Sequence, residues 1–398
     1  MSILSHCAIT QESDSRQAAL LVASQVRDHV GLQNLKAVVV YAAVDHDQEV
    51  ILASVREALG DIPIVGCSTG GLMGKGLFIE GGYVLGMLGI GGSAIHVTVG
   101  HVTEYQNHSE TKACDLGRVL RGGHTEPPKA VILYADPLCG ADMETFARRV
   151  QAEVGCPVIG AGAGQPWGFM VQTNQYVGTQ VLSHAVVGLA LYGDFVAECA
   201  TSTGTEPTTS SAIVTKAEGN VIVELDGRPA IQLYSEFLGD TVLTEITNET
   251  NSAVALGVEL PKTTHGSDVQ SPYVVRGPFM LDNARGGLVM GASIPTGTKI
   301  VFHRRSIAAA LEGAEAVAQT LRKRLAQRTV RVVLGFECGA RTAPLLGRAE
   351  ALREQLLVQR ILAPDAAWLG MLAWGELAPY NGLVTYYNYT LPLLVLAE

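Results

Sequence analysis

The residues best suited to chemistry stand at Gly66-Cys67-Ser68-Thr69-Gly70, directly after a short apolar run. This stretch formally matches Gly-x-Ser-x-Gly, in which a sharp turn from a strand into a helix exposes a nucleophilic serine. A hydrolase using Ser68 or Cys67 would need a helix directly after the turn. Four of the residues 70–76 are glycine, which makes that segment a poor helix. Hydrolysis is therefore the weakest interpretation of this stretch.

Two other interpretations of the same turn remain open. The first is structural, because the hydroxyls of Ser68 and Thr69 could cap local backbone groups in a tight turn. The second is ligand binding, because amides exposed in a glycine-rich turn, together with two hydroxyls, could hold a carboxylate or a similar anion. Ligand binding by residues 66–70 is the functional interpretation that we favour.

A second candidate site lies near the end of the chain. Cys338 and Arg341 follow the apolar run 331–336, and Glu376 follows the apolar run 368–374. If these two strands are neighbours, Arg341 and Glu376 project from one sheet edge, where ligands usually bind in open α/β sheets. An Arg and a Glu there could bind the carboxylate and the amine of an amino acid. A structural or solvated ion pair is the alternative.

Histidine spacing argues against a metal centre. The chain has 10 histidines, and no two stand at the i, i+4 spacing typical of zinc or non-haem iron sites. Haem needs only one axial ligand, so His184 and His303 are candidates, although each is more simply explained as a structural or surface histidine. We therefore predict no metal site and keep haem as an alternative cofactor.

The elements that must position these residues alternate between strands and helices. Asp14 with Gln17 predicts a helix start, and helical spacing of apolar residues continues to Gly31. The apolar run 36–41 predicts a buried strand, and residues 45–59 predict a second helix that stops at Gly60. The opening stretch then supplies the next strand. Such a strand-helix-strand unit usually has parallel strands joined by a right-handed crossover.

The same order returns about ninety residues later. Residues 130–134 match the first strand, residues 142–154 predict a helix closed by Gly155, and residues 156–164 repeat the apolar run and the glycines. The Cys-Ser-Thr side chains are absent from this second copy. The sequence therefore predicts an internal strand-helix-strand duplication in the first half.

The residue pattern changes in the second half, which has strand patterns at 221–225, 273–276 and 299–302 and a long helical pattern at 306–325. We predict an α/β protein of two domains, residues 1–215 and 216–398, each with a mixed β-sheet covered by helices.

Composition limits the partners and the location. Lysine and arginine total 28 against 38 acidic residues, which argues against broad binding to nucleic acid or to anionic membranes. No apolar stretch approaches the roughly 20 residues of a membrane helix, and the N-terminus lacks a signal-peptide pattern. The 7 cysteines are scattered without zinc or redox spacing. These features predict a cytoplasmic protein with reduced thiols.

Five motifs in order resemble those of FIST (F-box and intracellular signal transduction) proteins: Gly66-Cys-Ser-Thr-x-Gly71, Glu224–Ala230, Val333–Cys338, Gly375–Pro379 and Asn388–Thr390. The resemblance implies a sensory module that binds small molecules such as amino acids. It also implies a haem-based alternative, because some relatives are similar to nitric oxide sensors that regulate a histidine kinase. The chain has no recognisable output motif, so its output would need a separate protein partner.

Together these observations predict a non-enzymatic sensor that reversibly binds an amino-acid-like metabolite. The predicted ligand contacts are Gly66, Cys67, Ser68, Thr69, Gly70, Cys338, Arg341 and Glu376. The predicted partner is a signalling protein such as a histidine kinase, with haem-based sensing of nitric oxide as the alternative.

Overall fold

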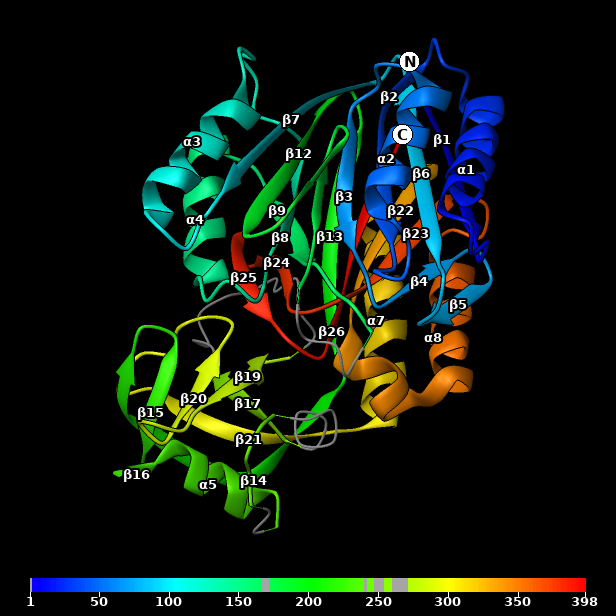
Figure 1. The fold of residues 1–398 in the computed structure, drawn as a ribbon. Coiled ribbons are helices and arrows are strands. Elements are labelled where there is room, and N and C mark those ends of the chain that lie inside the picture. The colour runs from blue at the N-terminus through cyan, green and yellow to red at the C-terminus, as the bar shows by residue number, and fades with distance from the viewer. Residues whose placement is uncertain (1, 167–171, 240–241, 247–253, 260–270) are drawn as a thin grey trace.

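Three similar α/β units and one inserted β-rich domain make up the molecule (Figure 1). The structure is a computed structural model, and it describes residues 2–166, 172–239, 242–246, 254–259 and 271–398. Within these residues, no helix is both long enough and apolar enough to span a membrane. The predicted α/β class with mixed sheets covered by helices is confirmed.

The first unit forms a sheet with the strand order β1-β6-β2-β3-β10-β11, in which β2 and β3 are parallel. Its strands are β1 (Ile3–Thr10), β2 (Leu35–Ala42), β3 (Ile64–Ser68) and β6 (Leu85–Gly92), joined by the hairpin β10 (Gln175–Val177) and β11 (Gln180–Leu182). Helices α1 (Ser15–Val30) and α2 (Gln48–Leu59) cover its outer face.

The second unit repeats this arrangement with the order β7-β12-β8-β9-β24-β25. Its strands are β7 (Ile95–Thr103), β8 (Ala130–Ala135), β9 (Val158–Gly162) and β12 (Ala185–Gly193), joined by the hairpin β24 (Glu376–Tyr380) and β25 (Leu383–Tyr387). Helices α3 (Ser109–Arg121) and α4 (Met143–Val154) cover it.

The third unit has the order β13-β26-β22-β23-β4-β5. Its strands are β13 (Val196–Thr203), β22 (Val330–Cys338), β23 (Ala367–Ala373) and β26 (Thr390–Ala397), joined by the hairpin β4 (Gly71–Gly74) and β5 (Leu77–Glu80). Helices α7 (Ile307–Leu325) and α8 (Gly347–Leu362) cover it, and the short turns Gly339–Arg341 and Thr342–Leu346 connect β22 to α8.

Each sheet therefore ends in a hairpin that belongs to another unit. The first unit lends β4–β5 to the third, the third lends β24–β25 to the second, and the second lends β10–β11 to the first. The predicted internal duplication of the sequence stays a prediction. What the units share in the structure is their strand order, and all three units share it.

An inserted domain separates β13 from α7. It contains β14 (Thr205–Glu218), β15 (Val221–Leu225), β16 (Arg228–Pro229), α5 (Ala230–Phe237), β17 (Val254–Glu259), β18 (Tyr273–Arg276), β19 (Pro278–Asp282), β20 (Gly287–Met290) and β21 (Lys299–Arg305). Its first and last residues, Thr205 and Arg305, are paired across β14 and β21. The predicted domain boundary at 215/216 lies within β14.

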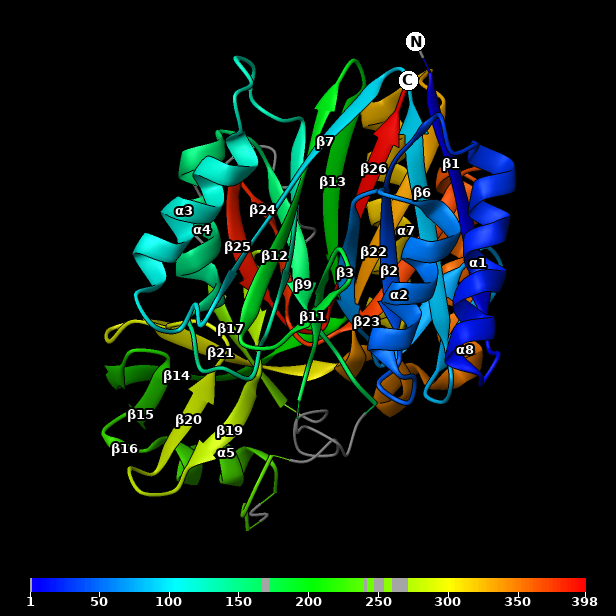
Figure 2. The same cartoon turned by 45° about the horizontal axis from the view of Figure 1, so that its top comes forward.

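The main core lies between the three sheets, while the helix pairs lie on the outside (Figure 2). Tyr41, Tyr134 and Phe336 occupy matching positions on β2, β8 and β22 and meet there. The hydroxyls of Tyr41 and Tyr134 are 2.8 Å apart, and the rings of Tyr134 and Phe336 have centroids 6.4 Å apart. The centre of the molecule is thus filled by side chains.

Local sequence signals explain where several helices begin and end. The Asp14 carboxylate accepts a hydrogen bond from Gln17 N at 2.8 Å, and Asp142 caps α4 in the same way through Thr145 N at 2.9 Å. Gly31 and Gly155 end α1 and α4 with positive φ, as glycine allows. These predicted helix boundaries are confirmed to within a residue.

Candidate functional site

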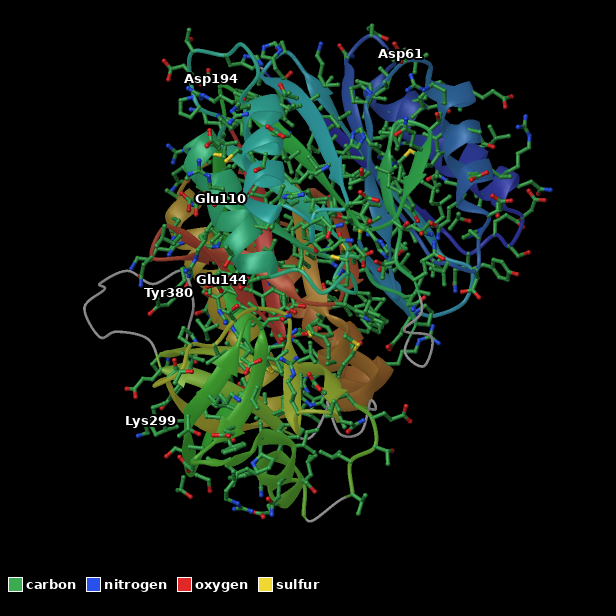
Figure 3. The ribbon with its side chains drawn as sticks, turned by 60° about the vertical axis from the view of Figure 1, so that its left-hand side comes forward. Asp61, Glu110, Glu144, Asp194, Lys299 and Tyr380 are labelled. Carbon is green, nitrogen blue, oxygen red and sulfur yellow. The ribbon has the colours of Figure 1, made fainter. Side chains whose placement is uncertain are left out.

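A cavity of about 680 Å³ lies between the second unit, the hairpin β24–β25 and the inserted domain. Figure 3 labels Glu144 and Tyr380 at this junction. Its volume is typical of a pocket for a small ligand. Helix α4 lines one wall with Asp142, Glu144, Thr145 and Arg148, while the inserted domain lines the other with Val258, Val274, Arg276, Ser293, Ile294 and Pro295. Because both bodies line it, their relative position sets its shape.

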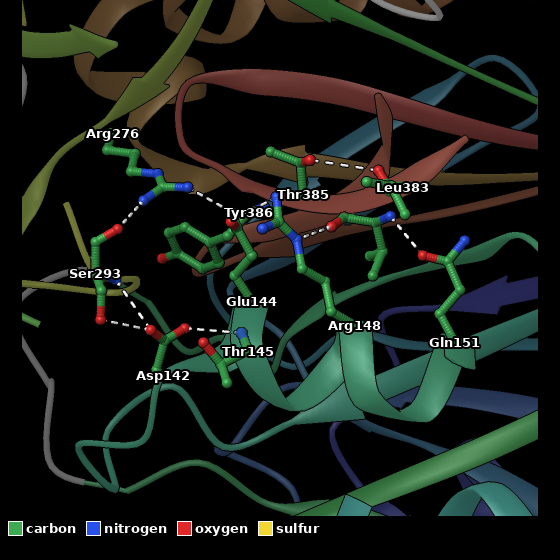
Figure 4. Close-up of polar contacts among 11 residues, drawn as sticks. Asp142, Glu144, Thr145, Arg148, Gln151, Arg276, Ser293, Leu383, Thr385 and Tyr386 are labelled. Carbon is green, nitrogen blue, oxygen red and sulfur yellow. Dashed lines mark hydrogen bonds and ion pairs between the residues drawn. The ribbon is translucent and has the colours of Figure 1, made fainter. Parts of the chain in front are cut away.

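Glu144 links the two bodies at the base of this cavity (Figure 4). Its carboxylate forms an ion pair with Arg276 of the inserted domain, accepts a hydrogen bond from Tyr386 N at 2.9 Å, and lies 2.8 Å from Arg148 Nη2. Arg276 also donates to Ser293 O at 2.6 Å. One carboxylate thus holds two guanidinium groups at the cavity.

The guanidinium groups retain capacity to bind a ligand. Arg276 is 6% exposed, and its Nε has no hydrogen-bond partner among the described residues. A buried donor without a partner is costly, so a ligand acceptor at this atom would be favourable. The side chain of Arg148 is 47% exposed, although its Nε donates to Val384 O at 3.1 Å. The cavity therefore offers a ligand acceptor the remaining donors of two guanidinium groups, both of which are already paired with Glu144.

Asp142 fixes a second contact between the bodies. Besides capping α4, its carboxylate accepts hydrogen bonds from Ser293 Oγ at 2.6 Å and Ser293 N at 3.2 Å. Burial alone would raise the pKa of Asp142, but the hydrogen bonds from Ser293 and Thr145 outweigh it and lower the pKa below its usual value. Asp142 is therefore ionised at neutral pH.

The turn at residues 66–70 lies elsewhere, on the axis around which the three units are arranged. Ser68 and Thr69 are fully buried. Ser68 Oγ accepts a hydrogen bond from Asn174 N at 3.0 Å, and Thr69 Oγ1 accepts one from Leu372 N at 3.1 Å. The Cys67 thiol lies in the main core, 3.7 Å from the sulfur of Met371. None of the three side chains lines the cavity.

Backbone hydrogen bonds join the three units into a closed ring at this axis. Gly70 N donates to Leu372 O at 3.4 Å, Trp374 N donates to Gly162 O at 3.1 Å, and Gly164 N donates to Ser68 O at 2.9 Å. Within the turn itself, Gly70 N thus has its partner in the third unit, whereas Thr69 N donates to Ala42 O of the first unit at 3.0 Å. The next element is strand β4, so the prediction that no helix follows this turn is confirmed.

Gly66 is required by the close approach of two strands. Its φ is 151°, and a Cβ there would lie 1.8 Å from Val40 O. Gly160 of the second unit has the same register and a φ of 153°, and its Cβ would lie 2.0 Å from Leu133 O. Both positions exclude any side chain.

Cys338, Arg341 and Glu376 are brought together, but inside the protein rather than at an open edge. Strands β22 and β23 are parallel neighbours, as the prediction required. Arg341 is fully buried and pairs with Glu337 and Glu354, and its Nη2 donates to Ala310 O at 3.0 Å. Glu376 is the first residue of β24, which pairs with β9 in the sheet of the second unit. Thr390 Oγ1 donates to its carboxyl at 2.9 Å. These three residues do not line the cavity either.

Burial controls ionisation in this cluster. It raises the pKa of Glu376 to about 8, more than the hydrogen bonds from Thr390 and the nearby Arg341 lower it. It raises the pKa of Glu337 well above its usual value, and the nearby Glu354 carboxylate adds to this despite Arg341. Glu376 is therefore mostly protonated at neutral pH.

Of the two histidine candidates for haem, His303 does not fit that role. His303 is fully buried, and burial lowers its pKa to about 4. Its Nδ1 lies 3.1 Å from Thr205 Oγ1, and its Nε2 faces Gly257, where even a Cβ would lie 2.3 Å away. No space remains there for a porphyrin. His184 is exposed, in a turn with a φ of 50°. The described residues contain no group of His, Cys, Asp and Glu side chains that could hold a metal ion.

Sequence reasoning missed the residues that line the cavity. Asp142 was recognised only as the first residue of a predicted helix, and Arg276 only as the last residue of a predicted strand. Glu144, Arg276 and Tyr386 are separated by more than a hundred residues each, so no motif joins them. A charged residue at the end of an apolar strand was the one available signal at Arg276.

Comparison with known proteins gives a consistent family assignment. A model of the FIST N domain matches residues 36–228, and a model of the FIST C domain matches residues 230–379. The two matches meet within the inserted domain.

Relatives at the level of single proteins carry little functional information. An uncharacterized protein of Mycobacterium bovis and one of Mycobacterium tuberculosis are each 23% identical over 408 residues, covering 97% of this chain and 96% of theirs. An uncharacterized protein of Methanocaldococcus jannaschii is 39% identical over 88 residues, 22% of this chain and 17% of its own. Among solved structures, a cyanuric acid hydrolase from A. caulinodans aligns over 100% of this chain and 99% of its own at 9% identity, with a TM-score of 0.36.

Proposed function

This chain belongs to the FIST family, and on that premise we propose that it is a cytoplasmic sensor that reversibly binds a small, carboxylate-bearing metabolite of the amino-acid kind. FIST domains are sensory domains of signal transduction. The observation that carries the proposal is the cavity of about 680 Å³ that contains Arg148 and Arg276 and has walls from two bodies.

The chemistry of the cavity suits such a ligand. A carboxylate can accept hydrogen bonds from Arg148 and from the Nε of Arg276, which has no partner in the part of the chain that the structure describes. An amine can donate to Asp142 or Glu144, and the apolar side chains of the inserted domain suit the rest of the molecule. The ligand binds here instead of at the turn and the buried cluster that the sequence indicated.

Binding can be converted into a signal because the cavity is shared. A ligand that contacts both walls favours arrangements in which α4 and the inserted domain are close, and so shifts the population of domain positions. A separate protein partner, such as a histidine kinase, responds to this shift in domain positions.

A thermal-shift screen of amino acids and related carboxylates on the purified protein tests this proposal. A ligand that binds the folded state raises the melting temperature. Arg148→Gln should weaken binding of that ligand by about tenfold or more, as expected for the loss of a charged hydrogen bond. Arg149→Gln is the matched control, because Arg149 lies on the same helix but pairs with Glu153 outside the cavity.

Three outcomes would overturn the proposal. The first is that no carboxylate raises the melting temperature, and the second is that Arg148→Gln and Arg149→Gln behave alike. The third is that reconstitution with haem gives a Soret band that is lost in a single histidine variant, which would support the haem alternative.

A further inference from the structure

A groove with an apolar floor runs along the outside of the third unit, between α7 and α8. Its volume is about 820 Å³, and the two helices lie together at the lower right of Figure 1. Its apolar side chains are Leu311 of α7 and Leu352, Leu356 and Leu357 of α8. Leu356 is 46% exposed. The other three leucines are partly buried, so together the four give the groove an apolar surface of the kind that another molecule can cover.

The rims of the groove carry opposite charges. Glu312 and Glu315 stand on the α7 side, and Arg353 and Arg360 stand on the α8 side. All four are exposed. Among the described residues, Glu312 and Arg360 have no ion-pair partner, and Glu315 accepts a hydrogen bond only from Gln319. Arg353 is paired with Glu350 of its own helix at 3.1 Å, so the charges most available to an incoming partner are Glu312 and Glu315 on one rim and Arg360 on the other.

We propose that this groove binds an amphipathic helix of the signalling partner, with a basic flank against α7 and an acidic flank against α8. The lining residues of α8 run from Ala349 to Arg360, which is about 16 Å or three helical turns at the rise of an α-helix. A helix that lays an apolar stripe into such a groove is a common mode of recognition. The two rims fix its direction, because only one orientation pairs both flanks.

The groove is connected to the cavity through the chain itself. Strand β17 contributes Val258 to the cavity and pairs with β21, in which Ile300 is the partner of Val258. Strand β21 ends at Arg305, and the next residue, Ser306, caps α7 through Ala309 N at 3.2 Å. Movement of the inserted domain therefore acts directly on the first turn of α7.

The buried side chain of Arg341 connects α7 and α8 beneath the groove. It bonds to Ala310 O of α7 and pairs with Glu354 of α8, and the backbone of Gly204 at the start of the insertion packs against it. A Cβ at Gly204 would lie 2.6 Å from Arg341 Nη1. A shift at this junction therefore changes the spacing of α7 and α8.

The inference rests on the proposed function in one respect, namely that the protein bound in the groove is a signalling partner. Docking and ligand binding are nevertheless separable, because the groove and the cavity share no lining residue.

The test uses two fluorescent helical peptides with the same leucine stripe. One has lysines along one flank and glutamates along the other, and the second has glutamates along both. Full-length protein should bind the mixed peptide about tenfold more tightly than the acidic one, a difference of about 1.4 kcal/mol. Glu312→Lys combined with Glu315→Lys should reverse this preference, because both rims are then basic. Leu356→Glu should abolish binding of both.

Leu21→Glu is the control, because Leu21 is a similarly exposed leucine, at 45%, on α1 of the first unit. The melting temperature of each variant is measured with and without the carboxylate ligand. Loss of folding and loss of ligand binding are therefore seen separately. Failure to bind either peptide, or equal binding in all variants, overturns the proposal. Self-association that Leu356→Glu abolishes would also overturn it, since the groove would then hold a second copy of this chain.

Discussion

Glu376 shows how a single buried carboxyl makes stability depend on pH. Its usual pKa is 4.5, and burial raises it to about 8 in the folded protein. Between these values the folded state keeps a proton that the unfolded chain releases, so the contribution to stability is complete below the lower value and is lost as the pH rises through the higher one. Stability should therefore fall from mildly acidic to mildly basic pH.

Glu376→Gln should remove part of this dependence, because glutamine is neutral throughout. Denaturant unfolding between pH about 5 and about 8 should give a shallower slope in this variant, by up to about 1.4 kcal/mol per pH unit. Glu337 contributes a dependence of the same sign, so some slope remains. Glu312→Gln, at an exposed position, serves as the control. Identical slopes in the two variants would contradict the raised pKa of Glu376.

At the same scale, the sequence indicated some chemistry but not where it would lie. Arg341 and Glu376 do follow two neighbouring parallel strands, as predicted. Sequence alone could not reveal that Arg341 would be enclosed by Glu337 and Glu354, because Glu354 comes from the following helix. Nor could it join Glu144 to Arg276, because that contact depends on how the inserted domain docks.

At the scale of elements, the glycines of β3 and β9 are a shared steric requirement. Gly66→Ala and Gly160→Ala each force a methyl group against a backbone carbonyl that cannot move without breaking the sheet. Each should cost several kcal/mol, at about the upper end of single substitutions. Gly155→Ala has open space and an αL backbone, and it should cost only about 1–2 kcal/mol for its positive φ. Thermal or denaturant unfolding of the three variants checks this, and similar losses at all three positions would refute it.

Helix boundaries could be predicted because their determinants are local. Asp14 and Gly31 lie within one turn of the ends of α1 and act on its own backbone. The pairing of hairpin β4–β5 with β23 could not be predicted, because Met73 and Gly370 are distant in sequence and carry no complementary signal. For the same reason, the turn at residues 66–70 was interpreted as an open site although neighbouring units enclose it.

At the scale of the whole molecule, exchange of hairpins makes the three units interdependent. The pairings of β4 with β23, of β9 with β24 and of β13 with β26 all cross residues 215/216. Fragments 1–215 and 216–398 produced separately should therefore lack the sharp unfolding transition and the near-ultraviolet circular dichroism of the intact protein. Mixing or co-expressing them should restore both signals. If either fragment alone melts cooperatively, that half is an independent domain.

The exchanged hairpin β4–β5 also has a consequence during synthesis on the ribosome. Its partner strand β23 emerges about 300 residues later, which at 5–20 residues per second is a delay of roughly 15–60 s. Throughout that time the nascent chain presents an unpaired strand edge and the apolar side chains of Leu72 and Phe78. The protein should therefore depend on chaperones that bind nascent chains, and slow translation of its second half should lower the yield of folded product.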